Sequence, residues 1–406
     1  MTNRSRQFFA KQISFGFLAL IAFVGPSALM GQLEAGDVEV LNTFDTNNVA
    51  VAGQFAFAAA GVQGVVIVDL SVPQIAGVVA PPGTTGSIDD VSIDGDLLFT
   101  LDAAGAGALS VFSIANPMQP TLVSGPVAVG VSPFAGVSAS NQRVVVSGGT
   151  GLLSERSYAT NGTLAASVST IDLGVGQPDV LVAEDGETAF VSTDFAGLFD
   201  GQTFGITVID IDGPTLSILD QIGIAGAGFS PGFDAPANFP IESAQSGDTL
   251  YVASGNGVSV FDVSNPSSVQ TLALIPLTTN PVNIDVVGNT LYVVGNSPMP
   301  TLSTIDVSVL SSPVVETTVL PTGSIPLGVA ATNTSVVIAD SNLGILVGSL
   351  LLIGDVNQDG VVDFFDISPF IEILSANGFQ AEADIDGNGV VNFFDISPFI
   401  EILSGN

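Results

Sequence analysis

The segment GVVIVDLS, residues 64–71, is a short apolar run that ends at an acidic turn, and variants of it recur along the chain. The variants are ALSVFSIA (108–115), VSTIDLG (168–174), GITVIDID (205–212), GVSVFDVS (257–264), LSTIDVS (302–308) and GILVGS (344–349). Two further apolar runs precede each of them, and Gly, Asn, Asp, Pro or Ser separates one run from the next. Runs of this length between such breakers predict short strands.

These segments define a repeat of seven units. The equivalent positions Asp69, Ser113, Asp172, Asp210, Asp262, Asp306 and Ser349 follow one another at intervals of roughly 40 to 60 residues. A fourth run, such as QTLALIPL (270–277), completes a unit. One such unit cannot bury its own apolar faces, whereas a closed ring of them can, which is the arrangement of a β-propeller. We therefore predict a mainly β fold with a seven-bladed β-propeller over residues 36–352; an open β-solenoid or two β-sandwiches are the alternatives.

The seventh unit has no fourth run of its own, because GILVGSLLLIGD (344–355) leads directly into a different kind of sequence. The segment GDVEVLNTFD (36–45) precedes the first unit and has no partner there. We expect it to supply the missing strand and to close the ring, which would remove exposed sheet edges.

The stretches VVIVDLSVP (65–73) and VSVFDVSNPS (258–267) resemble the LVIVD-repeat propellers, which are close in style to YVTN-type propellers. The resemblance implies a propeller of seven or eight blades and no particular chemistry. The acids at the repeated turn position (Asp69, Asp172, Asp210, Asp262 and Asp306) are expected to hydrogen-bond within their turns.

Three long segments interrupt the pattern on neighbouring units, at residues 152–164, 195–205 and 224–240. Long loops in a compact fold are more often functional than accidental. We expect all three on one face, where they would form a patch for an unknown ligand or partner from Arg156, Tyr158, Phe199, Phe204, Phe229 and Phe233. The alternative is a loop cluster that only packs on itself.

The residue inventory restricts the chemistry. The chain has 39 acidic and 5 basic residues, and three of the basic ones are Arg4, Arg6 and Lys11. So acidic a surface repels phosphate backbones, which argues against nucleic acid partners. The absence of His and Cys from the sequence excludes serine triads, cysteine nucleophiles and His-metal centres. Only a carboxylate mechanism is left, for example with Asp200 and Asp234, so we expect a non-enzymatic protein; a carbohydrate-active enzyme is the alternative.

Residues 1–35 combine a basic start with an apolar stretch from about Ile13 to Val24, followed by Gly25-Pro26. This pattern predicts a cleaved secretory signal and a secreted or cell-surface protein without a membrane span in its mature form. An uncleaved anchor is the alternative, although the stretch is short for a span.

Residues 353–406 contain a duplicated motif, DVNQDGVVDFFDISPFIEILS (355–375) and DIDGNGVVNFFDISPFIEILS (384–404). Each copy places oxygen donors at alternate positions, a Gly sixth and a carboxylate twelfth, as EF-hand-type loops do. The predicted ligands are Asp355, Asn357, Asp359, the Val361 carbonyl, Asp363 and Asp366 in the first loop, and Asp384, Asp386, Asn388, the Val390 carbonyl, Asn392 and Asp395 in the second. Hard oxygen donors in this number favour two Ca²⁺ ions. Two acidic turns without metal are the alternative.

A loop followed by one helix, written twice with Asp in the twelfth place, resembles a type I dockerin. The resemblance implies docking to a cohesin-like partner through the two residues before the last calcium ligand and through basic residues of the following helix. The matching pairs here are Phe364-Phe365 and Phe393-Phe394, and the helices carry Glu372 and Glu401 with no Lys or Arg. A different partner, or packing of the phenylalanines on the propeller, is therefore open.

Overall fold

The computed structural model describes most of residues 38–404. The gaps are 42–44, 81–86, 103–106, 131–135, 149–150, 174–178, 195–203, 225–241, 256, 351–352, 358–360, 377 and 386–389. The predicted signal, residues 1–35, lies outside the described residues. Among the helices that the structure describes, none is long and apolar enough to cross a membrane.

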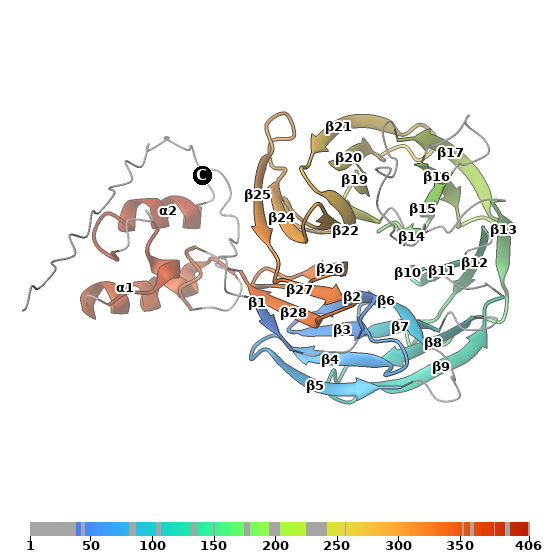
Figure 1. Ribbon diagram of the computed structural model, residues 1–406, viewed down its shortest axis with the longest axis horizontal. Coiled ribbons are helices and arrows are strands. Elements are labelled where there is room, and N and C mark those ends of the chain that lie inside the picture. The colour runs from blue at the N-terminus through green and yellow to red at the C-terminus, as the bar shows by residue number, and fades with distance from the viewer. Residues whose placement is uncertain are drawn as a thin grey trace, which may run out of the picture.

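The propeller prediction is confirmed: seven four-stranded antiparallel sheets stand around a central axis (Figure 1). Blade one is β2 (Asn48–Ala52), β3 (Phe55–Ala59), β4 (Val65–Asp69) and β5 (Gln74–Val79). Blade two is β6 (Ile88–Asp94), β7 (Leu97–Asp102), β8 (Ala108–Ser113) and β9 (Thr121–Ala128). Blade three is β10 (Val137–Ser140), β11 (Arg143–Ser147), β12 (Leu152–Ser157) and β13 (Ser169–Asp172).

The other blades repeat this plan, with the first strand nearest the axis and the fourth at the rim (Figure 1). Blade four is β14 (Asp179–Val182), β15 (Thr188–Asp194), β16 (Phe204–Asp210) and β17 (Ser217–Gly223). Blade five is β18 (Ser243–Ser246), β19 (Thr249–Ser254), β20 (Gly257–Asp262) and β21 (Gln270–Pro276). Blade six is β22 (Asn280–Val287), β23 (Thr290–Ser297), β24 (Thr301–Asp306) and β25 (Val314–Val319).

Blade seven is built from both ends of the ring. It contains β26 (Pro326–Ala331), β27 (Ser335–Asp340), β28 (Gly344–Ser349) and, at the rim, β1 (Val38–Val40). Strand β1 pairs antiparallel with β28, with Glu39 opposite Val347. The expectation that segment 36–45 completes the last blade is therefore confirmed, and the pairing closes the ring without an unpaired junction between its first and last units.

The apolar core is divided among the blade junctions. Each neighbouring pair of blades shares one buried cluster; Phe57 and Leu98, for example, meet between blades one and two. The same arrangement holds at the other six junctions, including that between blades seven and one, where Val337 packs with Val66. This is why the strands read as apolar on both faces: each central strand packs against a blade on either side.

Polar side chains of the inner strands connect successive blades. Asp90 of β6 accepts the N–H of Val137 in blade three at 2.6 Å, and Asn283 of β22 accepts that of Val329 in blade seven at 3.1 Å. Blades three and four are linked in the same way, by Ser138 and the N–H of Val182. These bonds satisfy backbone donors that the ladders leave unpaired near the axis.

One strand assignment from the sequence is wrong. VSTIDLG (168–174) was expected to be the third strand of its unit, but β13 lies at the rim and β12, with the sequence LLSERS, is the third strand. The pattern was hidden because β12 carries Glu155 and Arg156 where its equivalents carry apolar residues. Both are buried, and Glu155 pairs with Arg143 of β11 at 2.9 Å.

The C-terminal region forms two short helices, α1 (Ile367–Ala376) and α2 (Ile396–Ser404), with the 3₁₀ turns η1 (Phe364–Asp366) and η2 (Ala381–Ala383). Figure 1 places them outside the ring. The mainly β fold with a small C-terminal helical region is thus as predicted.

Candidate calcium and docking module

The first loop is organised around its last carboxylate. Asp366 accepts the N–H groups of Asn357 at 2.9 Å and of Asp363 at 2.8 Å, while Asp363 accepts the N–H of Phe365 at 2.7 Å. Asp363 and Asp366 thus form a reciprocal capping box at the start of η1. These bonds fix the loop against the beginning of α1.

The second loop repeats these contacts. Asp395 accepts the N–H of Asn392 at 2.7 Å, and Asn392 accepts that of Phe394 at 2.9 Å. The Asn392 amide also donates to the carbonyl of Val390 at 2.9 Å. The one chemical difference at this position is therefore an amide, Asn392, in place of the carboxylate of Asp363.

The donor set fits calcium. Asp355, Asp366, Asp384 and Asp395 are all buried, and the sequence contains no Lys, Arg or His after Arg156. Buried carboxylates are costly unless a positive charge accompanies them, and here no side chain of the module can supply it. Oxygen donors alone suit Ca²⁺.

Some predicted ligands lie outside the described residues, namely Asp359, Asp386 and Asn388. Within the residues that the structure describes, no group of three acidic side chains is close enough to hold a metal by itself.

The two helices pack face to face. Phe370 of α1 and Phe399 of α2 are buried, and their ring centroids lie 4.5 Å apart. Val356, Ala383 and Val391 complete this small core. The identical halves FFDISPFIEILS thus meet through equivalent residues.

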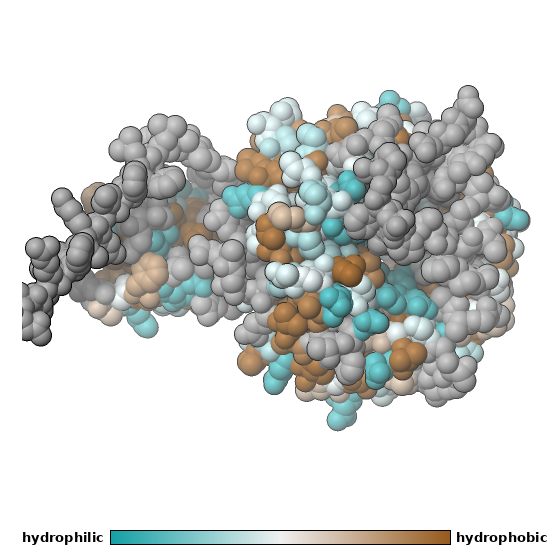
Figure 2. Space-filling view, in the orientation of Figure 1, coloured by the Kyte–Doolittle hydropathy of each residue, from teal (hydrophilic) through white to brown (hydrophobic). Residues whose placement is uncertain are grey.

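The phenylalanine pairs point away from this core. Phe364 and Phe365 are 76% and 75% exposed, and Phe393 and Phe394 are 80% and 77% exposed. The alternative in which these pairs pack on the propeller is therefore wrong. Figure 2 shows apolar side chains on the surface of the helical region.

The described members of the expected patch on the propeller, Arg156, Tyr158 and Phe204, lie at opposite ends of their blades. Arg156 lies in β12 and Tyr158 directly after it, so both stand at the end of the blade that carries the third-to-fourth strand turns. Phe204 begins β16 at the opposite end, where β15 and β16 connect. The turn that follows β12 therefore lies at the opposite end of its blade from the start of β16. Phe199, Phe229 and Phe233, and the acids Asp200 and Asp234, lie outside the described residues.

Arg156 and Tyr158 are buried rather than displayed. Tyr158 packs on Phe99 with ring centroids 4.7 Å apart, and its hydroxyl donates to Asp94. Burial, followed by that carboxylate, raises the pKa of Tyr158 well above its usual range. Arg156 donates to the Ala165 carbonyl at 3.1 Å. Arg156 and Tyr158 therefore pack within the propeller, as in the alternative in which the loop cluster only packs on itself.

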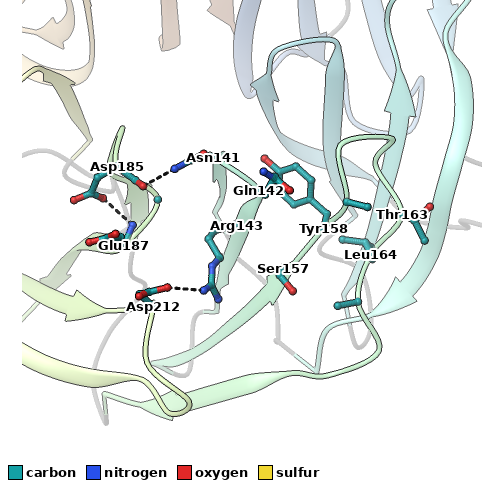
Figure 3. A pocket seen from close by; sticks show the side chains of 13 residues that line it. Asn141, Gln142, Arg143, Ser157, Tyr158, Thr163, Leu164, Asp185, Glu187 and Asp212 are labelled. Carbon is teal, nitrogen blue, oxygen red and sulfur yellow. Dashed lines mark hydrogen bonds and ion pairs between the residues drawn. The ribbon is translucent and has the colours of Figure 1, made fainter.

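A pocket of about 700 Å³ lies beside this segment, between blades three and four (Figure 3). Its residues include Arg143, Ser157, Tyr158, Glu187 and Asp212. Arg143 donates to Asp212 and to Glu155, both at 2.9 Å, and the bond to Glu155 is the main cause of the raised pKa of Arg143. The cation in this pocket is thus already paired within the protein.

Sequence reasoning missed a group of carboxyls near the propeller axis. Burial raises the pKa of Asp90 to about 7 and that of Asp179 to about 6. Glu242, which is hydrogen-bonded to Asp179, has its pKa raised well above its usual range by burial and then by that neighbour. The available signal was the polar residue at or near the start of the innermost strand in several repeats, as in Asn48, Asp90 and Asp179. Asp90 holds the N–H groups of Val91 and Val137, which indicates a structural role.

The repeated turn acids have the expected role. Asp69, Asp210, Asp262 and Asp306 each accept the N–H two residues on, at 2.8 to 3.0 Å. Asp172 does not belong to this series, because it lies in the rim strand β13. Four of the five expected turn acids are therefore confirmed.

Comparisons with known proteins agree with both parts of the chain. The model of the Dockerin type I domain matches residues 353–404, and that of the LVIVD repeat matches residues 45–74 and 244–273. No curated protein matches the chain.

Among solved structures, a chain of "Crystal Structure of Mitotic Checkpoint Complex" has a TM-score of 0.58 at 9% identity, covering 84% of this chain and 99% of that one. At this identity the likeness shows the fold alone. Solved chains that match number 1464, so the ring by itself does not indicate an activity. The chain is a seven-bladed β-propeller with LVIVD repeats and a Dockerin type I domain at residues 353–404; domains of that type generally bind calcium and imply a cohesin-type partner.

Proposed function

We propose that this protein is an exported, non-enzymatic binding or scaffold protein. Its dockerin domain attaches the chain to a cohesin-type partner at a cell-surface or extracellular assembly, and the propeller offers a second binding surface to a ligand. The observation that supports the proposed docking is the exposure of Phe364-Phe365 and Phe393-Phe394 beside the two loops. Large aromatic rings that stay exposed to water side by side are typical of a surface that a partner covers.

Calcium has a structural role in this proposal. The module has roughly fifty residues and no disulfide, which gives a core too small to fold securely alone. Two ions, one in each loop, would neutralise the buried carboxylates and couple metal binding to folding. The positions of Phe364 and Phe393 then depend on the metal, because both directly follow calcium ligands.

Export is supported by the N-terminal sequence pattern and by the usual extracellular setting of dockerin proteins. An acidic surface is also suited to a salty medium, in which self-repulsion is screened.

The docking proposal is tested with the full chain and a panel of cohesin-type modules, by biolayer interferometry in Ca²⁺ and again after EDTA. We expect one or more modules to bind in Ca²⁺ and to dissociate on chelation. Absence of binding to every module in Ca²⁺, with the helices folded by circular dichroism, would overturn the docking half.

The competing assignment is a dockerin-bearing enzyme that cleaves polysaccharides with two carboxylates. Assays of reducing ends on a set of polysaccharides decide between the two, using the wild type and the variants Asp200→Asn and Asp234→Asn. We expect no turnover by any of them. Turnover that either substitution abolishes would establish the enzyme instead.

A further inference from the structure

Each copy of the duplicated helix presents one continuous exposed surface, which we call the docking face. In the first copy it consists of Phe364, Phe365, Ser368, Ile371, Glu372 and Ser375, and all six are exposed. Turn η1 runs directly into α1, so residues three and four positions apart lie above one another on the same side. The second copy has the same residue types at the equivalent positions, with Phe393 and Phe394 just before α2 and the others in it, and they are also exposed.

Most of the area of this face is apolar. Besides the phenylalanine pairs, Ile371 and Ile400 are 55% and 58% exposed. The opposite side of each helix is already used, since Phe370 and Phe399 fill the core between the helices. The exposed apolar side chains therefore have no partner within the described part of the module.

The polar atoms of the face offer little for recognition by hydrogen bonds. The Ser375 hydroxyl donates to the Glu372 carbonyl of its own helix at 3.0 Å, and Ser404 does the same to Glu401 at 2.9 Å. Besides the exposed hydroxyls of Ser368 and Ser397, each face carries one charged group, the exposed carboxylate of Glu372 or Glu401.

Charge identifies the kind of surface that fits. The sequence has no basic residue after Arg156, so nothing within the module can balance these glutamates. A second copy of the chain would bring glutamate against glutamate, and a partner edged with acids would be repelled in the same way. A partner with Lys or Arg beside an apolar pocket gains both burial of the rings and an ion pair with the glutamate.

We propose that the docking face selects a cohesin-type module whose contact surface is an apolar pocket edged by Lys or Arg. This inference rests on the proposed docking function and adds the chemistry of the partner. Burial of a phenylalanine pair supplies the affinity, and Glu372 or Glu401 excludes partners of the wrong charge.

The test uses the full chain in Ca²⁺ and two cohesin-type modules chosen by their own surfaces. One has an apolar patch edged by Lys and Arg, and the other a similar patch edged by Asp and Glu. We expect the basic-edged module to bind at least about tenfold more tightly, by an amount that decreases as salt is raised.

Two double variants separate the contributions, each altered in both copies. Phe365→Ser with Phe394→Ser should weaken binding to the basic-edged module by about tenfold to a hundredfold. Glu372→Lys with Glu401→Lys should reverse the preference between the two modules. The matched controls are Phe379→Ser, an exposed phenylalanine between the helices, and Asp248→Lys, an exposed acid of the propeller; both should leave binding unchanged.

The outcomes are distinguishable. If neither module binds in Ca²⁺, the proposed docking function fails and this inference fails with it. If a module binds but the phenylalanine variant retains full affinity, or the acid-edged module is preferred, only the inference is overturned. Light scattering tests whether a second copy of the chain occupies the docking face. A dimer that is abolished by Phe365→Ser with Phe394→Ser would identify a second copy as the partner and would overturn the inference.

Discussion

Thr46 and Asp340, 294 residues apart in the sequence, are joined at the closure of the ring. The Thr46 hydroxyl accepts the N–H of Asp340 at 2.8 Å and donates to the carbonyl of Gly344 at 2.7 Å. The Asp340 carboxylate in turn accepts the N–H groups of Ile325 and Leu343, at 2.7 and 2.8 Å. Both residues are fully buried. One hydroxyl thus connects the segment before blade one to two strands of blade seven.

Substitution of Thr46 by Val should destabilise the whole propeller. Valine has nearly the same shape but leaves the Asp340 N–H and the Gly344 carbonyl with fewer partners in a buried site, which costs about 1–3 kcal/mol. Thermal and urea unfolding of the full chain measure the loss. The matched control is Thr271→Val on the exposed rim strand β21, which should change stability by less than about 0.5 kcal/mol. Equal stabilities of the two variants would contradict the role assigned to Thr46.

The two loops should differ in calcium affinity. The first has four carboxylates and the second has three: the exchanges Asn357/Asp386 and Asp359/Asn388 cancel, and Asn392 in place of Asp363 gives the net difference. Since affinity rises with ligand charge, the first loop should bind more tightly. Calorimetric titration of Asp355→Ala and Asp384→Ala with Ca²⁺ shows which binding site each substitution removes. Equal losses of Ca²⁺ affinity from the two substitutions would contradict the prediction.

A reciprocal exchange sharpens this comparison. Asp363→Asn should lower the affinity of the first loop toward that of the second, and Asn392→Asp should raise that of the second. Both substitutions preserve the side-chain acceptor for the N–H of Phe365 or Phe394, so the cap of each helix is retained. A change in helix content at saturating Ca²⁺ would show that folding, rather than ligand charge, had been altered.

The axial carboxyls should make the propeller less stable as pH rises from about 4 to about 7. Asp90, Asp179 and Glu242 have raised pKa values, chiefly through burial, so in this range the folded chain holds more protons than the unfolded chain. Glu242→Gln imitates the protonated carboxyl beside Asp179. We expect the variant and the wild type to have similar melting temperatures near pH 4, and the variant to become more stable by about 1–3 kcal/mol near pH 8. A constant difference across this range would contradict the assignment.

A structural feature can be predicted from the sequence when its residues recur at a regular spacing along the chain. The strand repeat indicated seven blades, and the alternate oxygen donors indicated the loops, because both depend on spacing along the chain. Exposure of Phe364 and Phe393 could not be decided in advance, since an aromatic pair beside a helix suits a core as well as a partner. The axial group of Asp90, Asp179 and Glu242 was missed because three distant blades bring it together.

The third strand of blade three contains a buried, ion-paired carboxylate in place of an apolar residue. Strand β12 lacks the apolar pattern of its equivalents, and its buried Glu155 is held by Arg143 at 2.9 Å. Arg143→Met should destabilise the chain by about 2–4 kcal/mol, because it leaves a buried carboxylate without its cation, whereas the exposed pair with Asp212 contributes little. The double variant Arg143→Met with Glu155→Leu removes both charges and should recover most of the loss, since apolar residues of similar size fit a third strand. Unfolding of the two single variants and the double variant gives the coupling energy. If the double variant were as unstable as the sum of the singles, the ion pair would not be what holds β12 in the third position of its blade.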